Sequence, residues 1–222
     1  MMRSLSPSRA MAWALVLATL IWACRPARGP EHASVNATLT RSGLHGIEVA
    51  DALEALIAVG ADSRADREYA HQTLSRAPAL TAQDALARAV VAGRLAQISG
   101  LSAPGLVAEV ERYARSSAVL VPSFRFGAAR RLLGTLYVMA PGTLLENGDS
   151  EVGLEILKDV AEHYPAHVPN RLRVAEAYIA LGDPEPAAPH LCFCVSQRSA
   201  LRPDERNVLD DLLAQSHMTQ CP

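Results

Sequence analysis

The sequence predicts an all-α fold, a solenoid of antiparallel helix hairpins with capping helices. Three observations predict it. Half of the 222 residues are apolar and only 5% are aromatic, and the apolar residues are mostly Ala, Leu and Val, which favours close-packed helices over strands. From residue 46 onward the apolar residues recur at helical spacing. Finally, parts of the C-terminal half resemble one another at constant intervals.

The first 24 residues have the pattern of an export signal. Arg3 and Arg9 precede the uncharged apolar run 11–23, which is shorter than the roughly 20 residues of a membrane-spanning helix. The run ends in Ala23-Cys24, and the letters IWAC resemble a bacterial lipobox, whose cysteine receives a lipid. The alternatives are an ordinary signal peptide cut near Ala23 and a retained anchor. We predict export in each case, with Cys24 as the lipidation site.

A tether is predicted at 25–44, because this stretch is polar, rich in Pro, Gly, Ala and Ser, and without periodicity. The predicted folded domain is 45–222. Arg25 follows the lipidated cysteine and is not an aspartate that retains lipoproteins in the inner membrane, so analogy favours the outer membrane of the bacterial envelope. The expected location of the domain is the periplasm.

The charge of the chain excludes some classes of partner. Removing residues 1–24 deletes two arginines and no acids, so the formal charge changes from −2 to −4 (−2 minus 2). An acidic domain argues against nucleic acid and against an electrostatic membrane patch. Membrane contact is therefore expected through the lipid anchor.

Helix-start signals support the periodic pattern. Ser63 with Asp66, and Thr81 with Asp84, have the spacing of a capping box. The predicted helices span residues 46–58, 63–75, 81–100, 104–119, 125–138, 150–163, 168–181, 187–197 and 203–215.

Two sets of positions recur along the chain. One set recurs after 34 residues, and its pairs are Gly153 with Ala187, Leu157 with Leu191, and Val160 with Cys194. The other recurs after 41 residues, and its pairs are Leu133 with Val174, Gly134 with Ala175, and Tyr137 with Tyr178. A single insertion of seven residues within 141–149 explains both intervals.

This pattern resembles the tetratricopeptide repeat, in which small residues lie where two helices cross closely and an aromatic residue fills the space beside the next unit. The resemblance predicts a tetratricopeptide-like antiparallel helix-hairpin solenoid with units at about 81–122, 125–165 and 168–200 and a cap at 203–216. The alternative is an ordinary Ala- and Leu-rich helical bundle, in which such matches arise by chance.

A second resemblance is to the T component of TRAP transporters, a family of periplasmic, lipid-anchored helical proteins. It covers about residues 80–216, and the matching positions are Gly127, Arg131, Leu133, Gly134, Tyr137, Pro141, Gly148, Asp149, Pro165, Asn170, Ala175, Glu176, Gly182 and Asp183. The resemblance implies association with a periplasmic solute-binding subunit and a small hydrophobic ligand in an apolar pore. The segment 143–146 departs from the family, which expects an aromatic and a proline there.

Three cysteines lie near the C-terminus, at Cys192, Cys194 and Cys221. In an oxidising compartment, a disulfide from Cys192 or Cys194 to Cys221 would hold the C-terminal tail. The alternatives are inert thiols and a metal site that includes His190. We predict a disulfide or inert thiols, and neither a metal nor a cofactor.

The chain carries no motif of a nucleophilic, metal-dependent or nucleotide-dependent enzyme, so we predict a non-catalytic protein. Candidate binding residues are expected on the concave face formed by the first helices of the units. They are Arg130, Arg131, Tyr137, Arg171, Arg173 and Tyr178. The alternative for the arginines is a solvated surface on which they pair with neighbouring acids.

The sequence therefore predicts a periplasmic lipoprotein that binds a partner protein and a small apolar ligand as an accessory of a TRAP-type solute transporter. The alternative function is a tetratricopeptide-type scaffold for the assembly of an envelope or secretion complex.

Overall fold

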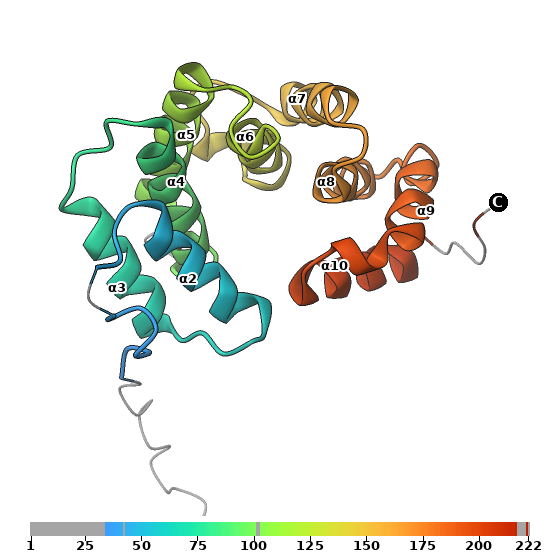
Figure 1. The fold of residues 1–222 in the computed structure, drawn as a ribbon. Coiled ribbons are helices and arrows are strands. Elements are labelled where there is room, and N and C mark those ends of the chain that lie inside the picture. Colours follow the sequence, from blue (N-terminus) through green and yellow to red (C-terminus); the bar gives the residue numbers. More distant parts are fainter. Residues whose placement is uncertain (1–33, 42, 101–102, 217–220, 222) are drawn as a thin grey trace, which may run out of the picture. The chain divides into compact units, whose positions relative to one another are not determined.

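The computed structural model describes residues 34–41, 43–100, 103–216 and 221 (Figure 1). The predicted signal segment, Cys24 and the first part of the predicted tether lie outside these residues. Every regular element among the described residues is a helix, which confirms the all-α prediction.

The helices follow one another through short connections. The α-helices are α2 (Ile47–Ala58), α3 (Arg64–Ser75), α4 (Ala82–Ala96), α5 (Ala103–Leu120), α6 (Ala128–Met139), α7 (Ser150–His163), α8 (Val168–Ala180), α9 (Ala188–Ser196) and α10 (Pro203–Gln215). Two short 3-10 helices are η2 (Gly142–Leu144) and η3 (Arg198–Ala200). Within this part of the chain, no helix is both long enough and apolar enough to cross a bilayer.

Both predicted capping boxes are present. The Asp66 amide donates to Ser63 Oγ at 3.2 Å, and the Ser63 amide donates to Asp66 Oδ2 at 2.8 Å. The equivalent distances between Thr81 and Asp84 are 3.1 Å and 3.3 Å. These bonds satisfy amides that have no partner within the helix, and they explain why α3 and α4 begin where they do.

Two predicted helix ends differ from the structure. Helix α6 begins at Ala128, later than the predicted residue 125, because Arg125, Phe126 and Gly127 have positive φ angles of 50°, 56° and 74°. This left-handed conformation does not continue into a right-handed helix. Helix α4 ends at Ala96, and the chain continues in turns to Gly100.

The described end of the predicted tether, residues 34–44, packs against the helices. Leu39 is buried in a core cluster with Leu53 and Leu74 from α2 and α3. The Asn36 amide also donates to the carboxylate of Asp66 at 2.6 Å. Because Leu39 adds to the apolar core and Asp66 satisfies a backbone donor, the folded part begins earlier than the sequence predicts.

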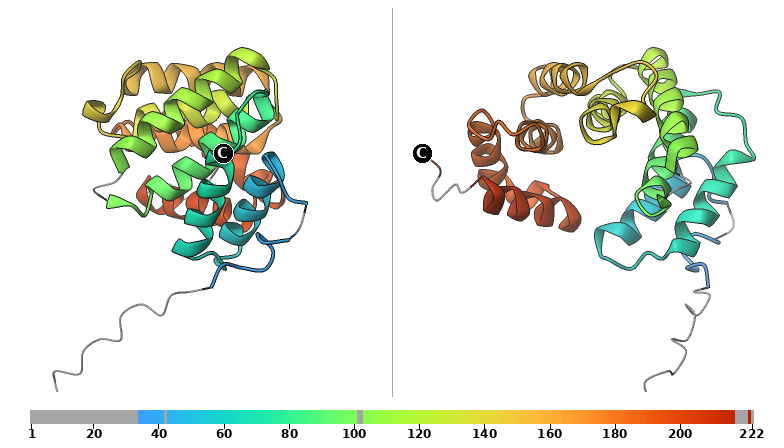
Figure 2. Two further views of the ribbon diagram at one scale, coloured as in Figure 1. Left: turned by 90° about the vertical axis from the view of Figure 1, so that its left-hand side faces the viewer. Right: turned by 180° about the vertical axis from the view of Figure 1, so that it is seen from behind.

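The helices alternate between two positions in the fold. Helices α2, α4, α6, α8 and α10, here called the inner helices, contact one another in succession, and α10 also contacts α2. Helices α3, α5, α7 and α9, here called the outer helices, each pack against the inner helices before and after them (Figure 1, Figure 2). Residues far apart in sequence are therefore brought together along the inner helices.

The closest helix crossing joins α6 to α7 at Gly134 and Gly153. A Cβ atom on Gly134 would lie 2.9 Å from the Gly153 carbonyl oxygen, and one on Gly153 would lie 2.8 Å from the Gly134 carbonyl oxygen. Both helices therefore need glycine at this point. At the positions that the repeat pattern aligns with these two, Ala175 and Ala187 are fully buried.

Candidate binding surface on the inner helices

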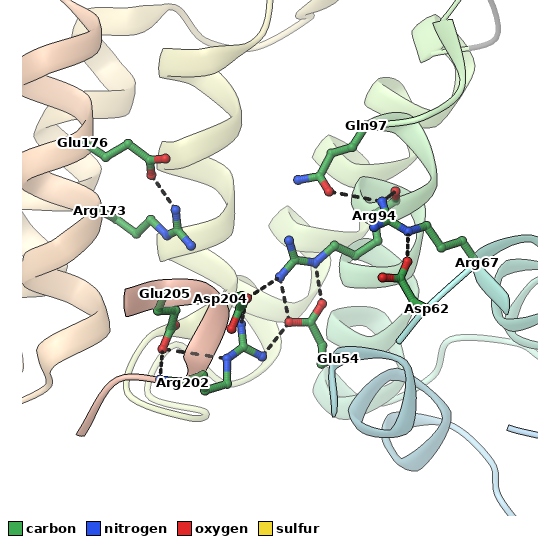
Figure 3. Close-up of polar contacts among 10 residues, drawn as sticks. All are labelled: Glu54, Asp62, Arg67, Arg94, Gln97, Arg173, Glu176, Arg202, Asp204 and Glu205. Atoms are coloured by element: carbon green, nitrogen blue, oxygen red, sulfur yellow. Dashed lines mark hydrogen bonds and ion pairs between the residues drawn. The ribbon is translucent and has the colours of Figure 1, made fainter. Parts of the chain in front are cut away.

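A network of ion pairs joins the first and last inner helices. Glu54 of α2 contacts Arg94 of α4, with oxygen–nitrogen distances of 2.5 and 2.8 Å. Glu54 also contacts Arg202, the residue before α10, at 2.7 Å (Figure 3). Glu54 and Arg202 are 148 residues apart in sequence. This contact therefore ties the end of the folded domain to its beginning.

Glu54 remains ionised in this network. Burial alone would raise its pKa, but the hydrogen bonds and positive charges of Arg94 and Arg202 outweigh burial and lower the pKa to about 2. Removal of either arginine would leave this buried carboxylate with less compensation for its lost hydration.

The start of α10 supplies further carboxylates to the same network. Asp204 accepts a hydrogen bond from Arg202 Nη2 at 3.1 Å, and Glu205 accepts one from the Arg202 amide at 3.0 Å. Glu205 is buried. Both residues belong to the cap predicted at 203–216, and both carboxylates contact the guanidinium of Arg202.

A second ion pair lies on α8, where Arg173 Nη1 is 2.6 Å from Glu176 Oε2. In Figure 3 these side chains extend from α8 toward the side chains of Arg94 and Arg202. We call this side of the inner helices, which carries Glu54, Arg94, Arg131, Arg173 and Arg202, the inner face.

Arg131 of α6 is held on the inner face by an amide. Arg131 Nη1 donates to Asn170 Oδ1 at 2.5 Å, and Asn170 Nδ2 donates to the carbonyl oxygens of Phe126 at 3.2 Å and Val160 at 3.5 Å. The two carbonyl groups occupy the donor end of Asn170, so its oxygen must point toward Arg131.

The pKa of Arg131 is unusual for arginine. Burial, followed by the positive charge of Arg173, lowers it to about 10, and Glu205 and Glu54 act in the opposite direction. Arg131 is still charged at pH 7. The neighbouring His167 has its pKa lowered to about 4 by burial and by the charge of Arg131, so this imidazole is neutral at pH 7.

Two of the six predicted binding residues, Arg131 and Arg173, share the inner face. Arg130 instead pairs with Asp159 of the outer helix α7 at 2.5 Å. The guanidinium of Arg171 lies over the ring of Phe193 in α9, 5.4 Å from its centroid. Neighbouring residues of an α-helix point about 100° apart, so Arg130 cannot share the face of Arg131.

Of the two predicted tyrosines, Tyr137 is not a surface residue of this face, which corrects that part of the prediction. Tyr137 is 1% exposed, and its hydroxyl donates to the buried Glu111 of α5 at 2.8 Å. Large aromatic side chains remove much apolar surface from water when they are buried, and Tyr137 therefore serves the packing between helices. Tyr178 is partly buried and packs among apolar side chains of α7 and α9.

The structure joins two of the three predicted cysteines. Cys192 and Cys221 form a disulfide with a Cα–Cα distance of 5.4 Å. Cys194 is a buried thiol, and burial raises its pKa to about 12. No group of three or more His, Cys, Asp or Glu side chains among the described residues has the arrangement of a metal site.

Several inner-face residues have no signal in the sequence that identifies them as binding residues, namely Glu54, Arg94, Asn170, Arg202, Asp204 and Glu205. The Asp204-Glu205 pair at a helix start is equally typical of a solvated cap. Their roles depend on contacts between helices that are distant in sequence.

A separate cavity of about 570 Å³ lies beside the outer helix α5. Its walls include Arg112, Arg115, Tyr113 and Asn147. In its wall, the carboxylate of Glu111 accepts hydrogen bonds from the backbone amides of Glu146 and Asn147, at 3.0 and 2.9 Å. These bonds hold the segment between α6 and α7 against α5.

The inner face therefore combines paired arginines and carboxylates from helices spread along the whole domain, and this arrangement suits noncovalent recognition of a charged group. No protein-family model matches the chain, and the comparison with curated proteins found no match.

Proposed function

We propose that this protein is a non-catalytic binding protein, anchored to the bacterial envelope by a lipid at Cys24 and accessory to a TRAP-type solute transporter. The observation that carries the proposal is the inner face, on which charged side chains of α2, α4, α6 and α8 meet those at the start of α10. The periplasmic solute-binding subunit is the proposed partner.

The proposal includes a tetratricopeptide-like solenoid as the framework. The positions that recur after 34 residues are buried in both helices, since Leu157, Val160, Leu191 and Cys194 are each at most 1% exposed. The Gly134–Gly153 crossing adds a contact that requires small residues. Both features support stacked helix hairpins of one kind.

The charges of the inner face indicate which kind of ligand it favours. Arg94, Arg131, Arg173 and Arg202 contribute guanidinium groups to it. A purely apolar molecule would displace water from these groups without offering them a new polar partner, which costs free energy. The inner face therefore favours a ligand or partner with polar or charged groups over the apolar ligand that the family resemblance implies.

A second candidate function is a scaffold for an envelope or secretion complex. It is favoured by three consecutive apolar residues at the end of α5, because Val119, Leu120 and Val121 are 81%, 51% and 43% exposed. Exposed apolar side chains that are contiguous are typical of protein–protein contacts.

Site-specific photo-crosslinking of the tagged full-length chain in its own cells separates the two functions. The crosslinking amino acid replaces Glu176 on the inner face in one version and Leu120 in the other. We expect a solute-binding subunit to be captured from position 176. Capture of an assembly component from position 120 alone would support the scaffold, and no specific product from either position would overturn both functions.

The anchor is tested separately. Cells that make the full chain are labelled with a radioactive lipid precursor, and we expect label in the wild type and none in Cys24→Ser. Equal labelling of the two proteins would contradict lipidation at this cysteine.

A further inference from the structure

Arg131 differs from the other inner-face arginines in its partners. Arg94 and Arg202 contact Glu54, and Arg173 contacts Glu176. Arg131 forms no ion pair within 4.0 Å with any of the described residues, and its one hydrogen-bond partner among them is the neutral amide of Asn170. Its positive charge is therefore not neutralised by direct contact.

Two nitrogens of the Arg131 guanidinium make no hydrogen bond to the described residues. The Asn170 oxygen binds Nη1, and Nε and Nη2 have no partner within the part of the chain that the structure describes. Neither nitrogen belongs to the described polar atoms that are both fully buried and without a hydrogen-bond partner, so each keeps some contact with solvent. Together they form an edge of two parallel N–H donors, the geometry that binds a carboxylate in a bidentate manner.

The surroundings of Arg131 leave it positively charged. Arg173 and Arg202 add positive potential at this position, and Glu205 and Glu54 subtract from it. A negatively charged group at the free edge of the guanidinium would therefore be attracted by it. His167 faces the same guanidinium as a neutral ring, so it adds no charge.

Asn170 also fixes the direction of the guanidinium. Its amide is held by the carbonyl oxygens of Phe126 and Val160, and the bond to Arg131 joins α6 to α8. A donor edge held in place before a ligand arrives loses less conformational entropy on binding.

We propose that Arg131, oriented by Asn170, binds the carboxylate group of a small organic acid on the inner face. This proposal deepens the binding function proposed above and rests on it. It names the chemical class of ligand and the guanidinium edge, Nε and Nη2, that would hold it.

Calorimetric titration of the full-length protein in detergent tests the proposal, with acetate, butyrate and benzoate as probes at constant ionic strength. The neutral benzamide and inorganic phosphate serve as comparison ligands. We expect saturable binding of at least one carboxylate and no binding of benzamide, and tighter binding of phosphate than of every carboxylate would contradict the assignment to a carboxylate.

Arg131→Met tests the residue, and we expect it to weaken carboxylate binding at least tenfold. Arg130→Met is the matched control, because Arg130 lies next to Arg131 in the same helix and pairs with Asp159 of α7; it should bind as the wild type does. If Arg131→Met does not fold, Arg131→Lys keeps the charge but offers no planar donor edge, and binding should weaken severalfold.

The outcomes also separate this proposal from the partner function. No carboxylate binding by the wild type, or equal binding by the wild type and Arg131→Met, would overturn the ligand site even if crosslinking captures a partner. If Arg131→Met loses crosslinking to the partner and no free carboxylate binds, the anion belongs to the partner, and the small-molecule proposal is again overturned. Carboxylate binding without any captured partner would leave the ligand site standing alone.

Discussion

At the scale of single residues, a few charged side chains between helices determine the electrostatics of the inner face. Glu54 is the clearest case, because two arginines from different parts of the chain contact its carboxylate. Removing one partner of a buried ion pair leaves the other charge buried without compensation. The free-energy cost of this is larger than the net contribution of the intact pair.

We expect Glu54→Gln to lower the free energy of unfolding at pH 7 by about 3 kcal/mol. The substitution leaves Arg94 and Arg202 facing a neutral amide. Urea denaturation of the full-length protein measures the effect. Glu48→Gln is the control, because Glu48 belongs to the same helix and its side chain is 54% exposed; it should change stability by less than about 0.5 kcal/mol.

The difference in stability between the wild type and Glu54→Gln is predicted to depend on pH. The pKa of Glu54 is about 2 in the folded protein, below its ordinary value of 4.5. Its contribution to stability is therefore complete above pH 4.5 and is lost as the pH falls from 4.5 through about 2. The stability difference between the wild type and Glu54→Gln should shrink over this range, and a difference independent of pH would contradict the ionised state of Glu54.

At the scale of elements, packing between inner and outer helices depends on the size of single residues at the crossings. The α6–α7 crossing is the tightest case, because a Cβ atom on Gly134 would also lie 2.8 Å from Leu157 Cγ. Gly93 of α4 has more room, since a Cβ atom on it would lie 3.6 Å from Val110 Cγ2. Packing therefore requires glycine at position 134 but not at position 93.

We expect Gly134→Ala to lower the free energy of unfolding by about 1 to 3 kcal/mol, because the added methyl group must separate α6 from α7. Gly93→Ala should leave stability unchanged or raise it by up to about 1 kcal/mol, because alanine favours the helix and meets only ordinary contacts. Thermal and urea unfolding of both variants measure the difference. Equal effects from both substitutions would show that the Gly134 crossing relaxes at no cost.

At the scale of the whole folded domain, the contact between α10 and α2 joins the two ends of the series of inner helices. The Glu54–Arg202 ion pair is the polar part of this contact. When two distant parts of a sequence contact each other, local unfolding of one part depends on the stability of the other. The stability of α2 is therefore expected to depend on a residue near the C-terminus.

We expect Arg202→Met to speed amide hydrogen exchange in both α2 and α10 at least tenfold, with little change in α6 and α7. Mass-spectrometric hydrogen exchange on the full chain measures this effect. Arg198→Met is the control, because Arg198 pairs with Asp210 at an exposed position, 42% and 53% exposed. Such surface pairs contribute about 0 to 1 kcal/mol. Faster exchange in α10 alone would show that the first and last inner helices open independently.

Local sequence patterns are enough to predict the helices of this protein. The helical periodicity predicted all nine α-helices described, most of their ends to within a few residues, and the capping boxes at Ser63 and Thr81. These features depend on interactions between residues that are close in sequence, such as a side-chain cap three residues from the amide that it binds. The turn at Arg125 to Gly127 was missed, because two of its three left-handed residues are not glycine.

Which charged side chains face one another depends instead on how the helices pack. The sequence singled out Arg131 and Arg173, but it also grouped with them the buried Tyr137 and the outward-facing Arg130. Which side of a helix faces its inner neighbour is determined by packing across the whole domain, and no local pattern encodes it. The pairing of Glu54 with Arg202 spans 148 residues, and the unpaired edge of Arg131 follows from how α6 and α8 meet at Asn170.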